Sequence, residues 1–136
     1  MTKTHRWLPH VTVATIIKRA DKYLMVEERC DDHGLVINQP AGHVDQDEGI
    51  VEAAIRETLE ETCWLVGIDH LIGIYQWSLP STRAHNLSTK TYIRFTLSGE
   101  AIEDKSDQLQ LDSDIVDTHW LTLDEIENNY IARSPL

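Results

Sequence analysis

One helical segment, set between stretches of β-branched residues, constrains the fold of this chain more than any other feature. Four apolar residues recur there at helical spacing, and no proline or glycine occurs between residues 50 and 66. This periodicity predicts an amphipathic helix over roughly residues 49–63. The apolar residues are Val51, Ala54, Ile55 and Leu59. We therefore expect the helix to bury the face centred on Ile55.

The opposite face of the predicted helix carries three glutamates. At about 100° per residue, Glu57, Glu60 and Glu61 span about 100° of this face. One interpretation is a solvated face, on which Arg56 forms weak i,i+4 ion pairs with Glu52 and Glu60. The other is a metal site, because clustered carboxylates repel one another and a hard cation such as Mg²⁺ or Mn²⁺ binds oxygen ligands. The helix alone does not decide between them.

Extended segments precede and follow this helix. Polar residues 18–22 predict a hairpin between the first two strands, and the acidic stretch 100–114 predicts a connection that begins irregularly. Thr122 and Glu125 form a capping-box pattern, so a last helix should begin at Leu123. The predicted strands are Val11–Ile17, Tyr23–Val26, Val36–Gly42, Leu71–Leu79 and Thr91–Leu97. This order predicts an α/β fold with a mixed sheet between helices, in a single domain spanning residues 1–136.

The charge balance limits the partners of the chain. Twelve basic and 23 acidic residues give a net charge of -11, which opposes attraction to nucleic acid or anionic lipid. No apolar run approaches the roughly 20 residues that span a bilayer, and the N-terminal residues lack the apolar stretch of a signal peptide. Two cysteines, Cys30 and Cys63, are too few for a disulfide framework. We expect a cytoplasmic monomer with a small-molecule substrate, and neither nucleic-acid nor membrane binding.

The residues before the helix decide how its acidic face is interpreted. Gly42 is followed after five residues by Glu48, and Glu48 after seven residues by the run that begins at Arg56. This spacing resembles the Nudix box, G-x5-E-x7-R-E-U-x-E-E-x-G-U with U apolar, the signature of the Nudix hydrolases. Six of the seven fixed positions match: Gly42, Glu48, Arg56, Glu57, Glu60 and Glu61. The resemblance implies a Nudix-type α/β/α sandwich with a loop-helix-loop catalytic motif.

The resemblance also implies an activity, the hydrolysis of a diphosphate bond joined to another group. Its metal ligands would be Glu57, Glu60 and Glu61, together with the carbonyl of Gly42. Arg56 would hold the glutamates in register through charge-assisted hydrogen bonds. Chemistry is consistent with these roles, because divalent metal ions neutralise phosphate oxygens and lower the pKa of an attacking water. By the same resemblance, Glu48 supports the ligands, and a direct ligand role for it stays open.

Three positions of the box depart from the usual pattern. Thr58 replaces an apolar residue, but its methyl group can be buried. Trp64 is a large residue at the final apolar position. Cys63 replaces the second glycine, which commonly adopts a left-handed conformation after a helix, at a cost of about 1 kcal/mol or more for other residues. We expect either strain at Cys63 or a helix end nearer Gly67, and a structural thiol whose pKa nearby carboxylates raise.

The wider sequence is similar to the phosphatase NudJ branch of the family. That branch implies Mg²⁺ as cofactor, orthophosphate release from nucleoside tri- and diphosphates, and action on thiamine diphosphate and its pyrimidine diphosphate precursor. The branch usually continues past the closing R-S-P-L stretch into a further helix, whereas this sequence stops there. The similar stretches are His10–Ala14, Asn38–His43, Gln76-Trp77, Arg94-Phe95, Asp112–Ile115 and Arg133–Leu136.

Four further residues are candidates for the substrate side of the site, each with a structural alternative. Trp77 would stack on a substrate ring or belong to the core. Arg94 would bind phosphate or form a surface ion pair. Asp114 would orient or deprotonate water, or only solvate a loop. His43 would contact phosphate or serve as a hydrogen-bonded structural histidine, and no histidine spacing indicates zinc.

Two other functions remain as alternatives. The first is a different Nudix specificity, for a nucleoside diphosphate sugar or a dinucleotide polyphosphate, which would release pyrophosphate or mononucleotides. The second is a catalytically silent Nudix module that binds a ligand, against which the complete glutamate set argues. The expected mechanism is in-line attack by metal-activated water, with a box glutamate or Asp114 as the base.

Overall fold

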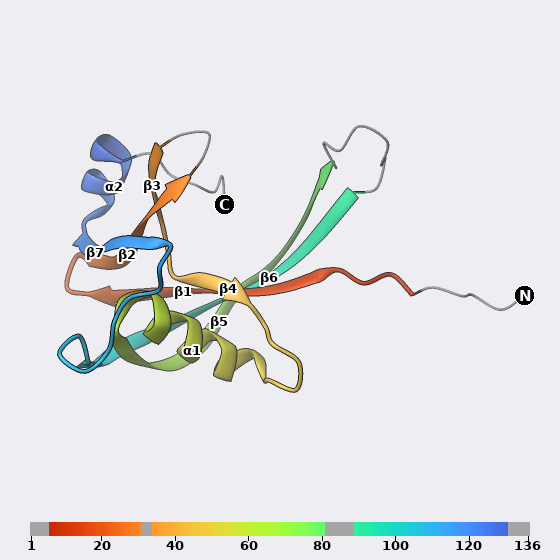
Figure 1. Cartoon of the computed structure of the whole chain (residues 1–136), viewed down its shortest axis with the longest axis horizontal. Helices are drawn as coiled ribbons and strands as arrows, with labels where there is room; N and C mark the ends of the chain where they lie inside the picture. The colour runs from red at the N-terminus through yellow and green to blue at the C-terminus, as the bar shows by residue number, and fades with distance from the viewer. Residues whose placement is uncertain (1–5, 31–33, 81–88, 131–136) are drawn as a thin grey trace, which may run out of the picture.

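The computed structural model describes residues 6–30, 34–80 and 89–130, which form a twisted sheet with two helices and a long projecting hairpin (Figure 1). The first two strands form the predicted hairpin, with Lys18 paired to Tyr23. The elements are β1 (His10–Arg19), β2 (Lys22–Cys30), β3 (Gly34–Asn38), β4 (Ala41–His43), α1 (Ile50–Thr62), β5 (Trp64–Pro80), β6 (Thr89–Asp104), β7 (Ile115–Leu121) and α2 (Leu123–Asn129). Residues 81–88 and 133–136, for which a loop and a family resemblance are predicted, lie outside the described residues.

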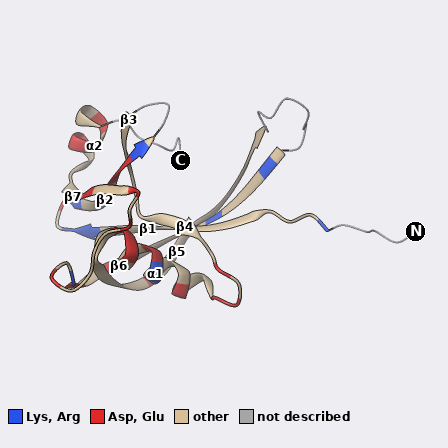
Figure 2. Ribbon diagram, viewed as in Figure 1, with Lys and Arg blue, Asp and Glu red and all other residues tan. Residues whose placement is uncertain are grey.

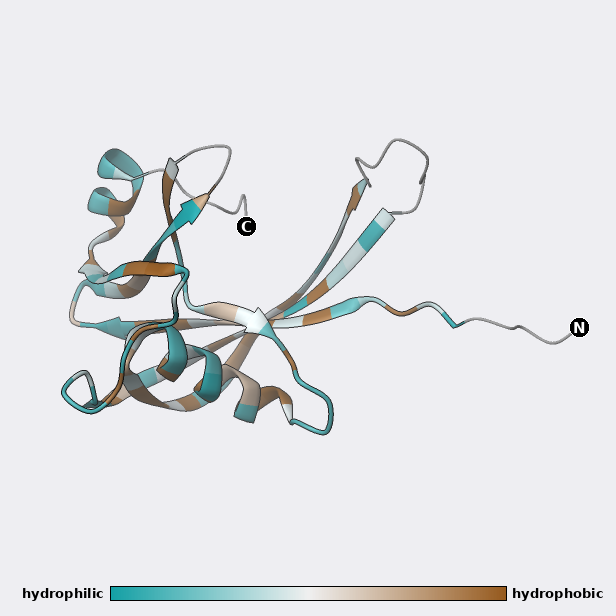
Figure 3. Cartoon of the chain, viewed as in Figure 1, coloured by the Kyte–Doolittle hydropathy of each residue, from teal (hydrophilic) through white to brown (hydrophobic). Residues whose placement is uncertain are grey.

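The sheet is mixed, as predicted. Its strand order is β3-β2-β1-β6-β5, with β4 added beside β1 and β7 beside β2. β1 and β6 run parallel, whereas β5 and β6 form an antiparallel hairpin. The apolar segments concentrate in the strands at the centre of the fold, and both helices alternate hydrophilic and hydrophobic residues (Figure 3). The predicted α/β class is therefore confirmed.

Helix α1 packs on the sheet through part of the predicted face, which is rotated away from Val51. Ala53 and Ala54 are buried against Val13 of β1 and Leu97 of β6, whereas Val51 is 48% exposed. Small alanine side chains let the helix approach the sheet closely, so the buried face turns toward them. The expectation that Val51 lies on the buried face is wrong.

Thr58 connects α1 to the sheet in a way that an apolar residue could not. It is fully buried, and its Oγ1 lies 2.8 Å from the Thr15 Oγ1 of β1. The Thr58 hydroxyl also donates to the Ala54 carbonyl. Its place at an apolar position of the box follows from this hydroxyl pair, because a buried hydroxyl is tolerated when it is hydrogen-bonded.

Most strands are longer than predicted, including β2, which continues through the charged residues 27–29 to Cys30, and one strand was not predicted. β5 begins at Trp64, β6 continues to Asp104 where an irregular segment was expected, and β7 was missed. The β5–β6 pairing contains three register shifts, two of them next to Gly67 or Gly73. Bulges let glycines remain inside a strand, so residues that resemble turn signals do not end it. The predicted strand 36–42 is instead divided into β3 and β4 by Gln39 and Pro40.

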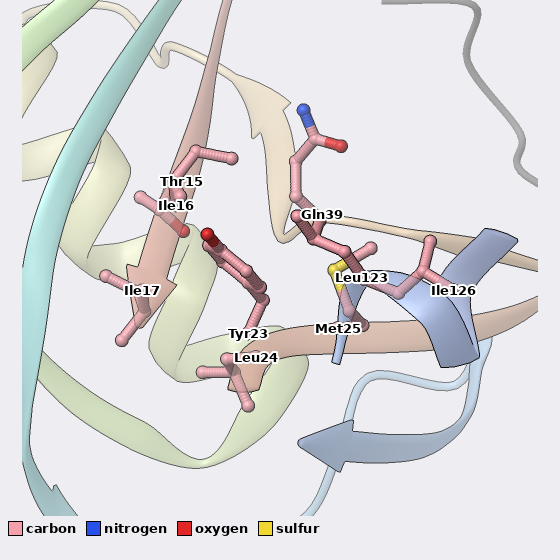
Figure 4. A pocket seen from close by; sticks show the side chains of 9 residues that line it. All are labelled: Thr15, Ile16, Ile17, Tyr23, Leu24, Met25, Gln39, Leu123 and Ile126. Carbon is pink, nitrogen blue, oxygen red and sulfur yellow. The ribbon is translucent and has the colours of Figure 1, made fainter. Parts of the chain in front are cut away.

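Helix α2 begins at Leu123, as predicted. Thr122 accepts a hydrogen bond from the Glu125 N–H, and the Glu125 carboxylate accepts one from the Thr122 N–H. Ile126 of α2 packs against Met25, Ile37 and Leu121. A small apolar cavity of about 240 Å³ lies between α2 and strands β1 and β2 (Figure 4). The described residues that line it include no acidic or basic side chain.

Neither described helix is long and apolar enough to cross a membrane.

Candidate active site

Arg56 stands at the centre of the acidic face and joins it to the preceding loop. Its Nε donates to Glu48 at 2.6 Å, and its Nη1 donates to Glu57 at 2.9 Å and to Glu60 at 3.1 Å. Its Nη2 donates to the His43 carbonyl and to Glu48. Acidic residues of α1 and of the loop before it lie on the same side of the molecule (Figure 2). The guanidinium therefore fixes three glutamates and the loop together.

Gly42 lies in β4 directly against the carboxylate of Glu57. A Cβ atom at residue 42 would collide with that carboxylate, so only glycine allows Glu57 to lie against this strand. The backbone of Gly42 pairs with Val13 of β1. This arrangement brings Gly42, whose carbonyl is a predicted metal ligand, into contact with Glu57, the first glutamate of the predicted ligand set.

Glu61 occupies the most buried position of the acidic face. Its side chain accepts a hydrogen bond of 2.8 Å from the Ala41 N–H, and the residue is 9% exposed. The pKa of Glu61 is raised to about 8, chiefly by burial, with smaller contributions from the charges of Glu57, Glu28 and Asp112, while the Ala41 hydrogen bond lowers it. Burial also raises the pKa of Glu57 against the effect of Arg56.

Two acids outside the box belong to the same cluster and were missed by sequence reasoning. Glu28, buried in β2, and Asp112, in the loop before β7, both act on the charge of Glu61. The Asp112 N–H donates to the Glu60 carbonyl at 3.2 Å. Asp112 has one sequence signal, its position two residues before the candidate Asp114. Glu28 belongs to no motif that would single it out from the sequence.

The donor chemistry of this cluster fits a divalent cation. The carboxylates of the cluster outnumber the positively charged side chains that contact them. Carboxylate oxygens are the ligands that Mg²⁺ and Mn²⁺ prefer. In the described parts of the chain, however, no three His, Cys, Asp or Glu side chains converge as they would around a bound metal ion. Arg56 holds Glu57 and Glu60, and the Ala41 N–H holds Glu61. Shared coordination would require these carboxylates to turn from their present partners.

The helix end resolves the question raised by Cys63. Cys63 is the C-cap residue and adopts the left-handed conformation, with φ 63° and ψ 12°. The strain expected at Cys63 is thus present, and the alternative of a helix end near Gly67 is wrong, because β5 begins at Trp64. Burial raises the pKa of the Cys63 thiol, and Asp104 and Asp112 contribute, in place of the neighbouring glutamates that we expected.

The left-handed backbone at residue 63 predicts an inverted order of stability for two variants. Cys63→Gly and Cys63→Ala both remove the buried sulfur, but only glycine adopts φ 63° without strain. We expect Cys63→Gly to be more stable than Cys63→Ala by about 1 kcal/mol in urea unfolding. At an ordinary helix or strand position the alanine variant would be the more stable of the two. A more stable Cys63→Ala would therefore contradict the left-handed backbone at residue 63.

The Arg56–Glu48 contact predicts a pH dependence of stability. Hydrogen bonds from Arg56 and from the Asp45 N–H lower the pKa of Glu48 from 4.5 to about 2. A lowered folded-state pKa adds stability above the unfolded pKa, and this stability disappears as the pH falls. We expect the free energy of unfolding to fall between pH 4.5 and pH 2, and to fall less in Glu48→Gln. Equal slopes in urea titrations of the two proteins would contradict this.

A cavity of about 480 Å³ opens beside the acidic face. On one side it is lined by the strand and helix residues Gly42 and Glu61, with Glu28 and Asn38 beside them. The other side consists of residues of β5 and β6. These residues are Trp77, Leu79, Tyr92 and Arg94. The cavity therefore joins two of the predicted metal ligands, Gly42 and Glu61, to three of the predicted substrate contacts, because His43 also lines it.

A row of stacked rings forms the wall of the cavity on the β5–β6 side. The Trp77 ring stacks on Tyr92 with centroids 5.4 Å apart, and Tyr92 stacks on His10 with centroids 5.0 Å apart. These residues are direct partners in adjacent strands. The Arg94 guanidinium lies 5.2 Å from the Trp77 ring centroid. Trp77 is half-buried and lines the cavity. One face of its ring is already covered by Tyr92.

The remaining candidates are placed differently. Arg94 is 9% exposed, so it is buried and does not lie at the surface. His43 lies in the cavity wall and its Nε2 is 3.1 Å from the His10 Nδ1, which agrees with a hydrogen-bonded structural histidine and leaves it within reach of a ligand. Asp114 is exposed in the turn where the Ile115 N–H donates to the Asp112 carbonyl. Asp112, rather than Asp114, is the acid that acts on Glu57 and Glu61.

Comparison with known proteins agrees with this geometry. Residues 8–135 match the NUDIX domain. The chain is 38% identical to phosphatase NudJ of Escherichia coli K12 over 128 residues, 94% of this chain and 78% of that protein. It is 41% identical to a NUDIX hydrolase from Nitrosomonas europaea, with a TM-score of 0.80 over 94% of this chain and 82% of that one. An ADP-ribose pyrophosphatase from Streptococcus suis, 19% identical over 93% of this chain and 81% of that one, shares the fold with a TM-score of 0.67.

The fold, the acidic helix and these relatives define a hydrolase that acts on phosphoric anhydride bonds. The chain belongs to the Nudix hydrolase family. The resemblance to that family and to phosphatase NudJ is confirmed.

Proposed function

We propose that this Nudix hydrolase is a Mg²⁺-dependent phosphatase of small diphosphate compounds. Its substrates would be nucleoside tri- and diphosphates, thiamine diphosphate and the pyrimidine diphosphate precursor of thiamine. Support for this class comes from the similarity to phosphatase NudJ of E. coli over 94% of the chain. A cytoplasmic location, a monomeric state and a single domain stay predictions.

One observation carries the proposal: Gly42 and Glu61 line the same cavity as Arg94 and Trp77. A diphosphate beside the glutamates would therefore leave its organic group facing the ring wall. Glu57, Glu60 and Glu61, with the Gly42 carbonyl, would hold Mg²⁺ or Mn²⁺. The bound cation would neutralise phosphate oxygens and make a water more acidic.

The chain's own residues would then position the reactants. Arg56 would keep Glu48, Glu57 and Glu60 in register through the bonds that it already makes. The buried Arg94 would pair with a phosphate oxygen, because a guanidinium matches that geometry. One of the acids beside the ligands, a box glutamate or an acid of the 112–114 turn, would accept the proton of the attacking water.

The test is an assay of product identity. Purified protein is given a panel of nucleoside tri- and diphosphates, thiamine diphosphate, a nucleoside diphosphate sugar and a dinucleotide polyphosphate, each with Mg²⁺. We expect orthophosphate from the nucleotides and from thiamine diphosphate. Pyrophosphate or mononucleotides as the main products would favour the other Nudix specificities, and no product at all would favour a silent binding module.

A further inference from the structure

Asn38 is a polar side chain that neither the box nor the predicted substrate contacts include. It is the last residue of β3 and is paired with Val26 of β2. Two residues later, the Pro40 carbonyl accepts a hydrogen bond of 2.9 Å from the Thr15 N–H. The backbone on both sides of the side chain is therefore fixed by the sheet.

The side-chain amide of Asn38 is buried beside the active-site cavity, and its oxygen lacks a hydrogen-bond donor among the described residues. Asn38 is 9% exposed and lines the cavity together with Glu61 and Arg94. Its Oδ1 has no hydrogen-bond partner among the described residues. Buried polar atoms in proteins are almost always paired, so an orphaned oxygen at a cavity indicates a partner supplied from outside the chain.

The chemistry of that partner follows from the atom that is unpaired. A carbonyl oxygen only accepts hydrogen bonds, and so do ionised phosphate oxygens. Asn38 Oδ1 is therefore unsuited to the diphosphate itself. The nearby cavity residue Glu28 is also an acceptor when ionised. The complementary group is an N–H or O–H donor on the organic part of the substrate.

We propose that Asn38 is a specificity residue that accepts a hydrogen bond from an amino or hydroxyl group on the organic part of the substrate. The inference rests on the proposed function for the identity of the site, and it goes beyond it by assigning how that organic part is recognised. A site that hydrogen-bonds a donor group discriminates against analogues that lack it, because its acceptor is then left unpaired.

Matched nucleotide pairs test this with Asn38→Leu, which keeps the size of the side chain and removes its polarity. GTP and ITP differ only in the purine 2-amino group, ATP and purine riboside triphosphate only in the 6-amino group, and ATP and dATP only in the ribose 2′-hydroxyl. Dissociation constants are measured by calorimetry in EDTA, so that binding is read without turnover. We expect Asn38→Leu to weaken binding of the donor-bearing member of at least one pair about 3- to 10-fold, and to leave the other member nearly unchanged.

Two variants separate this role from a structural one. Asn38→Ala serves if the leucine variant does not fold, and Gln39→Ala is the matched control, because Gln39 lines the apolar cavity instead. The inference is overturned if the affinity ratios within all pairs are unchanged, if both members of every pair lose affinity equally, or if the wild type binds no probe. Failure of the proposed function is a separate result, namely no hydrolysis of these nucleotides with Mg²⁺ by a wild type that binds them.

Discussion

Replacement of Glu61 by glutamine is expected to lower kcat by at least about 100-fold with little change in stability. The glutamine amide oxygen can still accept the hydrogen bond from the Ala41 N–H, so the side chain should remain in place. Glutamine also resembles the neutral carboxyl form that burial favours, since the pKa of Glu61 is raised to about 8. The variant would therefore remove the anionic oxygen that a bound cation requires without removing a contact from the fold.

The matched control for this variant is Glu52→Gln on the same helix. Glu52 is exposed in the first turn of α1 and lies outside the cavity. Steady-state rates with saturating Mg²⁺ and urea unfolding curves would be measured for both variants. Unchanged turnover of Glu61→Gln, or an equal loss in Glu52→Gln, would show that the acidic face is not the reaction centre.

Replacement of Arg56 by methionine is expected to reduce both activity and stability. Methionine keeps much of the apolar stem but leaves Glu48, Glu57 and Glu60 without their common cation. Arg56 is only 26% exposed, so its charged hydrogen bonds are only partly screened. We expect the free energy of unfolding to fall by about 2 kcal/mol, and kcat to fall about 10- to 100-fold.

Two comparisons make this result specific. Arg56→Lys keeps the charge but cannot donate to Glu48 and Glu57 with the geometry of a guanidinium, so it should recover stability only in part. Arg29→Met removes an exposed arginine from β2 and serves as the control. Full recovery by lysine would mean that only the charge of Arg56 matters, which would contradict its role in fixing the glutamates in register.

Sequence reasoning predicted the parts of the site that depend on spacing along one helix and its preceding loop. The resemblance of Gly42, Glu48 and Arg56 to the Nudix box implied that they lie around the same glutamates, and the structure places Arg56 in contact with Glu48, Glu57 and Glu60. The small rotation of α1 that exposes Val51 was not predictable in the same way, because hydrophobicity favours Val51 whereas close packing on the sheet favours Ala53. Hydrophobic periodicity measures polarity and not the space between a helix and a sheet.

The residues that complete the cavity could not be predicted because they meet only through the sheet. Asn38 at the end of β3 and Tyr92 in β6 are 54 positions apart (92 minus 38) and line the same cavity. Glu28 becomes a neighbour of Glu61 through the position of β2 relative to α1. The full length of β5 and β6 likewise depends on their pairing with each other, which overrides glycines and charges that resemble strand ends.

The central claim is that Glu57, Glu60 and Glu61 hold a divalent cation, and direct titration of the metal tests it without a substrate. Mn²⁺ would be added to the wild type and to a variant that combines Glu57→Gln, Glu60→Gln and Glu61→Gln, with free Mn²⁺ followed by electron paramagnetic resonance. We predict saturable binding to the wild type, competition by Mg²⁺, and affinity at least about 100-fold weaker in the variant. Equal Mn²⁺ affinity in a folded variant would contradict the claim.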